Sequence, residues 1–112
     1  MKDDETKYSI EEVVSLCKTC DIVIIPRDKT KDFMNKCGKT SDDIENEIRQ
    51  LKEISACADP ELDYGEGRKG YVYQFKKLVF DKYWCYIKVK IKTGQNKEVW
   101  VLSFHEEEFV WH

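Results

Sequence analysis

The chain has 112 residues, of which 37% are charged and 41% hydrophobic, and its formal net charge is -3. This length predicts one domain over residues 1–112 that can bury a core unaided, and the composition excludes a disordered tail. No apolar run approaches the ~18 residues of a membrane span, so we expect a cytoplasmic protein that has no membrane partner.

The first predicted elements are a helix and a strand. Ser9 followed by Glu12 forms a capping-box pair, and apolar residues at helical spacing behind it predict a helix over residues 10–18. The β-branched run at residues 22–25, stopped by Pro26, predicts a short strand inside the sheet or at its edge.

Two further helices are expected in the middle of the chain. A short helix begins at Thr30, its predicted cap, and ends at Gly38, which suits a left-handed C-terminal cap. A longer helix over residues 42–54, capped by Thr40 or Ser41, carries one apolar stripe and therefore packs on one side.

The rest of the chain predicts a loop followed by three strands. Residues 56–70 are rich in glycine and charge and predict a loop. Three strands follow, over residues 71–77, 83–92 and 98–105, joined by short links. The expected fold is therefore α+β, an antiparallel meander with N-terminal helices packed on one face.

Alternation sorts the strand residues onto two faces of the sheet. In the last strand we expect one face to hold Trp100, Leu102 and Phe104, opposite Val99 and Val101. The face away from the helices is then expected to carry Gln74, Lys76, Tyr86, Lys88, Lys90, Ser103 and His105.

Charge is distributed unevenly along the chain. Residues 1–63 hold 10 Lys and Arg against 16 Asp and Glu, whereas residues 65–105 hold 9 against 3. A local basic excess acts on phosphate within the Debye length of ~8 Å, whatever the total charge. The predicted sheet is thus a candidate nucleic-acid-binding surface, and a solvated lysine surface is the alternative.

The residue types on this face suit RNA in particular. Lysines neutralise phosphates and aromatic rings stack on unpaired bases. Cleavage by the 2′-hydroxyl of RNA needs a base, a cation and an acid, roles that His, Lys and Tyr can fill. His105 is the first candidate because histidine titrates near neutrality. The alternative to a catalytic role is that His105 lies at a strand end and only forms hydrogen bonds. The alternative to RNA binding is that the lysines prevent edge-to-edge aggregation of the sheet.

The segments YVYQFKK (71–77), YWCYIKVKI (83–91) and VLSFHEEE (101–108) resemble the C-terminal meander of the MqsR family of bacterial toxins, in the RelE-like group. The resemblance implies a RelE-like α+β fold, metal-independent cleavage of messenger RNA, free or on the ribosome, and neutralisation by a cognate antitoxin. It places Tyr86 at the position of the family's active-site tyrosine and Gln74 near that of its catalytic glutamine. His105 stands where the best-known members carry a catalytic lysine. Gly65 occupies the expected position of another family lysine, for which Arg68 or Lys69 can substitute.

The five cysteines are scattered, which is typical of reduced intracellular thiols. Cys17 and Cys20 form a Cys-x-x-Cys pair, yet a zinc site needs four ligands, so no metal or other cofactor is expected. The resulting hypothesis is an endoribonuclease with His105, Tyr86 and Gln74 as catalytic residues. RNA-binding roles are expected for Lys88, Lys90, Lys76, Arg68 and Lys69. The alternatives are a non-catalytic nucleic-acid binder and a protein-binding inhibitor that use the same face.

Overall fold

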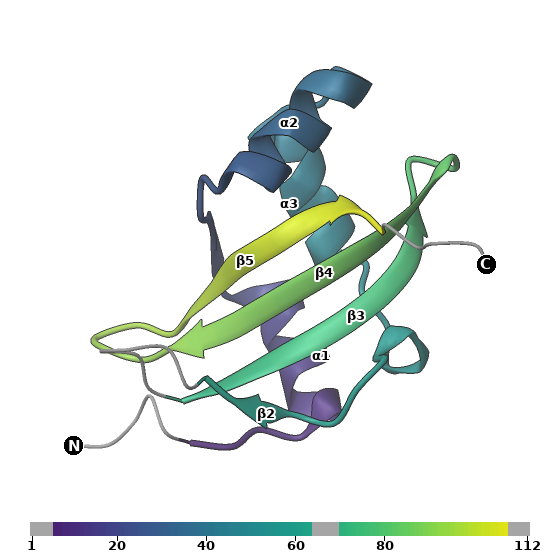
Figure 1. Ribbon diagram of the computed structural model, residues 1–112. Coiled ribbons are helices and arrows are strands. Elements are labelled where there is room, and N and C mark those ends of the chain that lie inside the picture. Colours follow the sequence, from purple (N-terminus) through teal and green to yellow (C-terminus); the bar gives the residue numbers. More distant parts are fainter. Residues whose placement is uncertain (1–5, 64–69, 108–112) are drawn as a thin grey trace.

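The computed structural model describes residues 6–63 and 70–107 and confirms the α+β class (Figure 1). Among these residues it has three α-helices and one five-stranded sheet. The helices are α1 (Ile10–Thr19), α2 (Asp28–Cys37) and α3 (Ser41–Arg49), followed by the short 3-10 helix η2 (Glu53–Ser55). The strands are β1 (Asp21–Ile24), β2 (Glu61–Leu62), β3 (Tyr71–Val79), β4 (Tyr83–Lys92) and β5 (Glu98–Glu106).

The strand order in the sheet is β1-β5-β4-β3-β2, and β3, β4 and β5 form the expected antiparallel meander. The expectation of a purely antiparallel sheet is wrong, because β1 pairs in parallel with β5. The expected loop also contains the short edge strand β2, which pairs with β3. The sheet is therefore mixed, and its two edges are formed by short strands.

The helix boundaries follow their caps. Ser9 and Glu12 form the predicted capping box of α1. Gly38 ends α2 with a φ of 67°, as expected, but α2 begins at Asp28, so Thr30 lies inside the helix and does not cap it. The helix predicted over residues 42–54 ends early, at Arg49.

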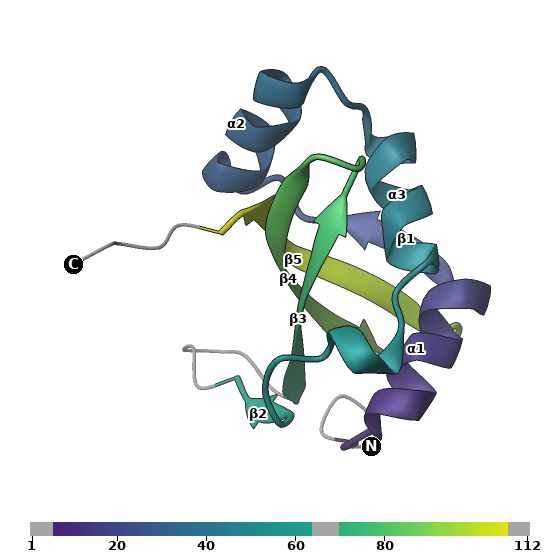
Figure 2. The same cartoon turned by 90° about the vertical axis from the view of Figure 1, so that its right-hand side faces the viewer.

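Helices α1 and α3 cover one face of the sheet, as Figure 2 shows edge-on. Their apolar residues pack against the inward side chains of the meander, as the alternation predicted. Burying such side chains removes apolar surface from water, which stabilises the fold. The fully buried residues of this core include Val13, Cys17, Ile44, Ile48, Phe75, Ile87, Val89 and Phe104. The opposite face of the sheet, turned away from α1 and α3, is called the open face below.

Helix α2 lies along the end of β5 that β1 does not reach (Figure 1). The buried Thr30 hydroxyl accepts a hydrogen bond of 3.2 Å from the backbone N–H of Phe104. An unpaired N–H in a buried strand is destabilising, so Thr30 replaces the partner that a neighbouring strand would supply. This is why Thr30 is buried in the middle of α2.

A β-bulge interrupts the pairing of β4 and β5. Ser103 pairs with Lys88 and Val101 with Val89, so Leu102 has no partner on β4. One extra residue shifts the in-and-out alternation of a strand by one position.

The bulge overturns the predicted faces of β5. Val99 and Val101 face the core before the bulge and Phe104 faces it afterwards, whereas the prediction placed Phe104 opposite the two valines. Trp100 pairs with Lys90 and so lies on the open face rather than beside Phe104. The open face of β5 therefore includes Trp100, Ser103 and His105.

Candidate functional site

The open face presents three rows of side chains across β3, β4 and β5. Each row is set by the strand register, because directly paired residues point to the same side of a sheet. The rows are Lys76–Tyr86–His105, Gln74–Lys88–Ser103 and Val72–Lys90–Trp100. All seven residues that the sequence placed on this face therefore lie on it together.

Tyr86 is the centre of a hydrogen-bonded chain. Its hydroxyl donates to Gln74 Oε1 at 2.9 Å, and Gln74 Nε2 donates to Glu61 Oε1 on β2 at 3.2 Å. Burial raises the pKa of the Tyr86 phenol, and the nearby Cys57 and Glu61 raise it further. The phenol therefore keeps its proton at neutral pH and acts as a donor.

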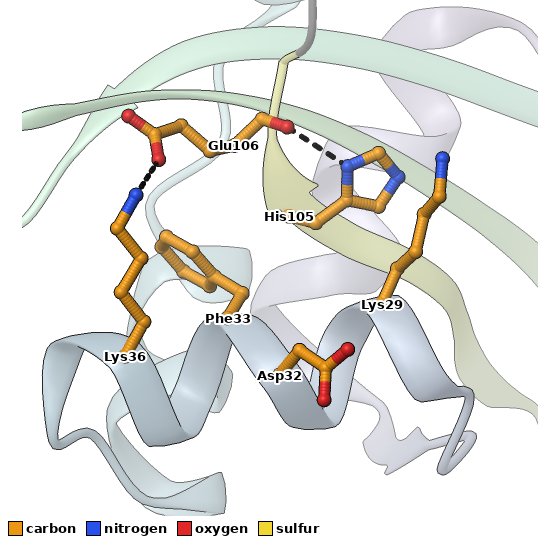
Figure 3. Close-up of a pocket in the computed structure, with 6 residues that line it drawn as sticks. All are labelled: Lys29, Asp32, Phe33, Lys36, His105 and Glu106. Carbon is orange, nitrogen blue, oxygen red and sulfur yellow. Dashed lines mark hydrogen bonds and ion pairs between the residues drawn. The ribbon is translucent and has the colours of Figure 1, made fainter.

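His105 lies directly beside Tyr86, with 5.8 Å between the ring centroids. His105 Nδ1 lies 3.0 Å from the carbonyl oxygen of Glu106 (Figure 3). Because a carbonyl oxygen only accepts, Nδ1 carries the hydrogen, and in the neutral ring Nε2 is left with a free lone pair. His105 is thus held in the tautomer that can take a proton through Nε2.

A cavity of about 350 Å³ lies between α2 and the end of β5, with His105 in its wall. Lys36 forms an ion pair with Glu106 at 2.5 Å, and this contact raises the pKa of Lys36. Figure 3 shows Lys29 extending toward the imidazole from the first turn of α2. The cavity has three basic and two acidic groups; it is lined by Lys29, Asp32, Phe33, Lys36, His105 and Glu106.

The lysines of the open face differ in their partners. Lys76 pairs with Glu107 at 2.6 Å, which raises the pKa of Lys76. Lys90 pairs with Asp63 at 3.2 Å and is almost fully buried. Among residues 6–63 and 70–107, Lys88 has no ion pair and is half-buried between the other two rows. Lys88 is therefore the ammonium most available to a phosphate.

Two predicted RNA-binding residues, Arg68 and Lys69, lie outside the described residues. One residue of the open face was missed from the sequence: Trp100, whose ring lies 5.2 Å from Lys92 Nζ. Only the bulge reveals its orientation, because both sides of β5 are rich in apolar residues and give no clear alternation.

The cysteines do not form a metal site within the described part of the chain, where no three His, Cys, Asp or Glu side chains cluster. Cys17 is fully buried in the core, and burial raises its pKa to about 12. A thiol in this state is neither a good metal ligand nor a nucleophile.

Comparisons with protein-family models, curated proteins and solved structures find no match for this chain. No described helix is long and apolar enough to cross a membrane.

This arrangement can move protons and stabilise negative charge. His105 Nε2 is a base, the Tyr86 phenol is a proton donor, and the Lys88 ammonium is a cation in the next row of the sheet. Fixed groups of this kind act at a reacting phosphate without having to reorganise during the reaction.

Proposed function

We propose that this protein is a toxin-type endoribonuclease that cleaves single-stranded messenger RNA without a metal ion. The observation that carries the proposal is the contact between His105 and Tyr86 on an open sheet face that also presents Lys88. The order of these residues along the meander is similar to that of the MqsR family, which supports a RelE-like fold. The proposed location is the cytoplasm, where messenger RNA is found.

The proposed reaction is attack of a 2′-hydroxyl on the adjacent phosphate. His105 Nε2 takes the proton of that hydroxyl, O2′ bonds to phosphorus, and the P–O5′ bond breaks. Lys88 stabilises the negative charge of the phosphorane. The Tyr86 phenol donates its proton to O5′, and the resulting phenolate regains a proton from the neighbouring His105 imidazolium. The products are a 2′,3′-cyclic phosphate and a 5′-hydroxyl, and both catalytic groups return to their starting forms.

The remaining predicted residues bind and orient the RNA. Gln74 fixes the Tyr86 hydroxyl through the 2.9 Å hydrogen bond. Lys76 and Lys90 can contact phosphate only by exchanging their carboxylate partners, whereas Lys88 needs no such exchange. A cognate antitoxin would inhibit the enzyme by covering the open face and thus excluding RNA.

The test is incubation of labelled single-stranded RNA with purified protein in EDTA, with products resolved on a gel. Wild type should cut the RNA at discrete positions and give fragments that end in a 2′,3′-cyclic phosphate. His105→Ala should lower the rate by roughly 10²–10⁴-fold, the usual contribution of one acid–base group. The matched control is His112→Ala, which removes the other histidine of the chain and should cut normally.

Cleavage by His105→Ala at the wild-type rate would refute the catalytic assignment. Intact RNA with a salt-sensitive shift would favour the first alternative, a non-catalytic binder, or a toxin that needs the ribosome, because phosphate contacts give a steep salt dependence. Binding only to a protein partner, with weak salt dependence, would favour the second alternative, a protein-binding inhibitor.

A further inference from the structure

Trp100 is an aromatic side chain that the strand register places on the open face, in the same row as Lys90. Its indole Nε1 donates to Glu98 Oε1 at 3.1 Å, so the polar edge of the ring is satisfied within the chain. The ring borders a surface cavity of about 420 Å³ beside the β4–β5 turn. What Trp100 still offers to a ligand is therefore its π-face.

The ring face already attracts a cation. Lys92 Nζ lies 5.2 Å from the ring centroid, close enough for a cation–π contact. Gln95 and Asn96, which carry amides, line the same cavity. An aromatic ring beside an ammonium group is the combination that binds a base together with its phosphate.

The distance from this ring to the catalytic row fits one strand of RNA. Tyr86 and Lys90, which head the first and third rows on β4, are four residues apart, or about 13 Å at the rise of a β-strand. Lys88 lies midway between them on the same face. A strand with its scissile phosphate at His105 therefore passes Lys88 before it reaches Trp100.

We propose that Trp100 is a base-stacking subsite, which holds an unpaired base of the RNA a few nucleotides from the cleaved bond. That the bound polymer is single-stranded RNA follows from the proposed function, on which this inference rests. When the base stacks, Lys92 leaves the ring face and contacts the phosphate of that nucleotide. Since stacking uses the π-face and no base edge, the subsite accepts any of the four bases.

The experiment measures binding by fluorescence anisotropy, with a labelled 2′-O-methyl octauridylate as the probe. This probe cannot be cut, because its 2′-oxygen has no proton and cannot attack. Trp100→Ala should bind about five- to 150-fold more weakly than wild type, which corresponds to the loss of one base stack. Trp100→Phe should retain most of the affinity, and Ile54→Ala, which truncates an exposed apolar side chain outside the sheet, should bind normally.

A second probe, the same backbone without bases, separates stacking from a structural effect. Wild type and Trp100→Ala should bind this abasic probe equally, since it offers nothing to stack. The subsite would be overturned if wild type and Trp100→Ala bound the octauridylate equally. It would also be overturned if Trp100→Ala lost the same affinity for both probes, or if wild type bound neither. Base-dependent binding through Trp100, together with no cleavage of unmodified RNA in the gel assay, would refute cleavage of free RNA and keep the subsite.

Discussion

The Lys90–Asp63 ion pair should be a major contribution to stability. The two side chains are 7% and 10% exposed, and their charged atoms are 3.2 Å apart. Asp63→Asn keeps the shape but leaves a buried ammonium without a carboxylate. Breaking a buried pair in this way destabilises a protein by about 3–5 kcal/mol. In a domain of 112 residues, that lowers the melting temperature by about 4 °C for each kcal/mol.

Urea unfolding followed by circular dichroism measures this loss. The matched control is Glu107→Gln, which removes the partner of Lys76. That pair is more exposed, at 36% and 21%, and should contribute at most about 1 kcal/mol. Adding Lys90→Met to Asp63→Asn removes the uncompensated charge and should recover most of the loss. If Asp63→Asn were as stable as Glu107→Gln, the assignment of Lys90 as a buried, paired charge would be wrong.

Three further predictions concern the backbone and the thiols. Thr30→Val should lower the free energy of unfolding by about 1–3 kcal/mol, because it leaves the β5 N–H buried and unpaired, whereas Thr30→Ser should be near wild type in the same urea assay. Gly38→Ala should cost about 1–2 kcal/mol, because its φ of 67° disfavours a side chain; Gly94→Ala is the control, and an equal loss there would contradict the argument. Burial raises the pKa of Cys17 and of Cys85 to about 12, so both thiols stay neutral in the folded state after the unfolded chain has begun to ionise. The contribution of these two thiols to stability should therefore be constant below pH ~8.5 and be lost as the pH rises toward about 12. Urea midpoints that did not change above pH ~8.5 would exclude the effect.

Local signals in the sequence predicted the local structure well. Ser9 with Glu12, and Gly38, mark helix ends through contacts with residues close by in the chain, so a short window contains the whole cause. The meander was equally readable, because the alternation in β4 is clean. The end of α3 could not be predicted in this way. Leu51 is fully buried although the helix has already ended, so it extended the apolar stripe from which the helix was predicted.

Non-local pairing could not be predicted from the sequence. The parallel contact of β1 with β5 joins segments separated by most of the chain, and neither segment signals the other. The bulge at Leu102 is equally hidden, because the residues before it are apolar on both faces. The candidate site also combines local and non-local features. Alternation correctly placed His105 and Tyr86 on the open face, but their contact and the position of Trp100 depend on the register between strands.

The place of β5 in the sheet has a consequence for synthesis on the ribosome. This strand lies between β1 and β4, although every other described helix and strand precedes it in the chain. Until β5 emerges, β1 has no neighbour in the sheet and α2 has no strand end to cover. Such long-range pairings form late and slowly, because closing the intervening chain loses entropy before the contacts are made. A nascent chain that lacks β5 can pair β2, β3 and β4 but has neither the complete sheet nor His105, so the proposed site forms only when β5 has been made.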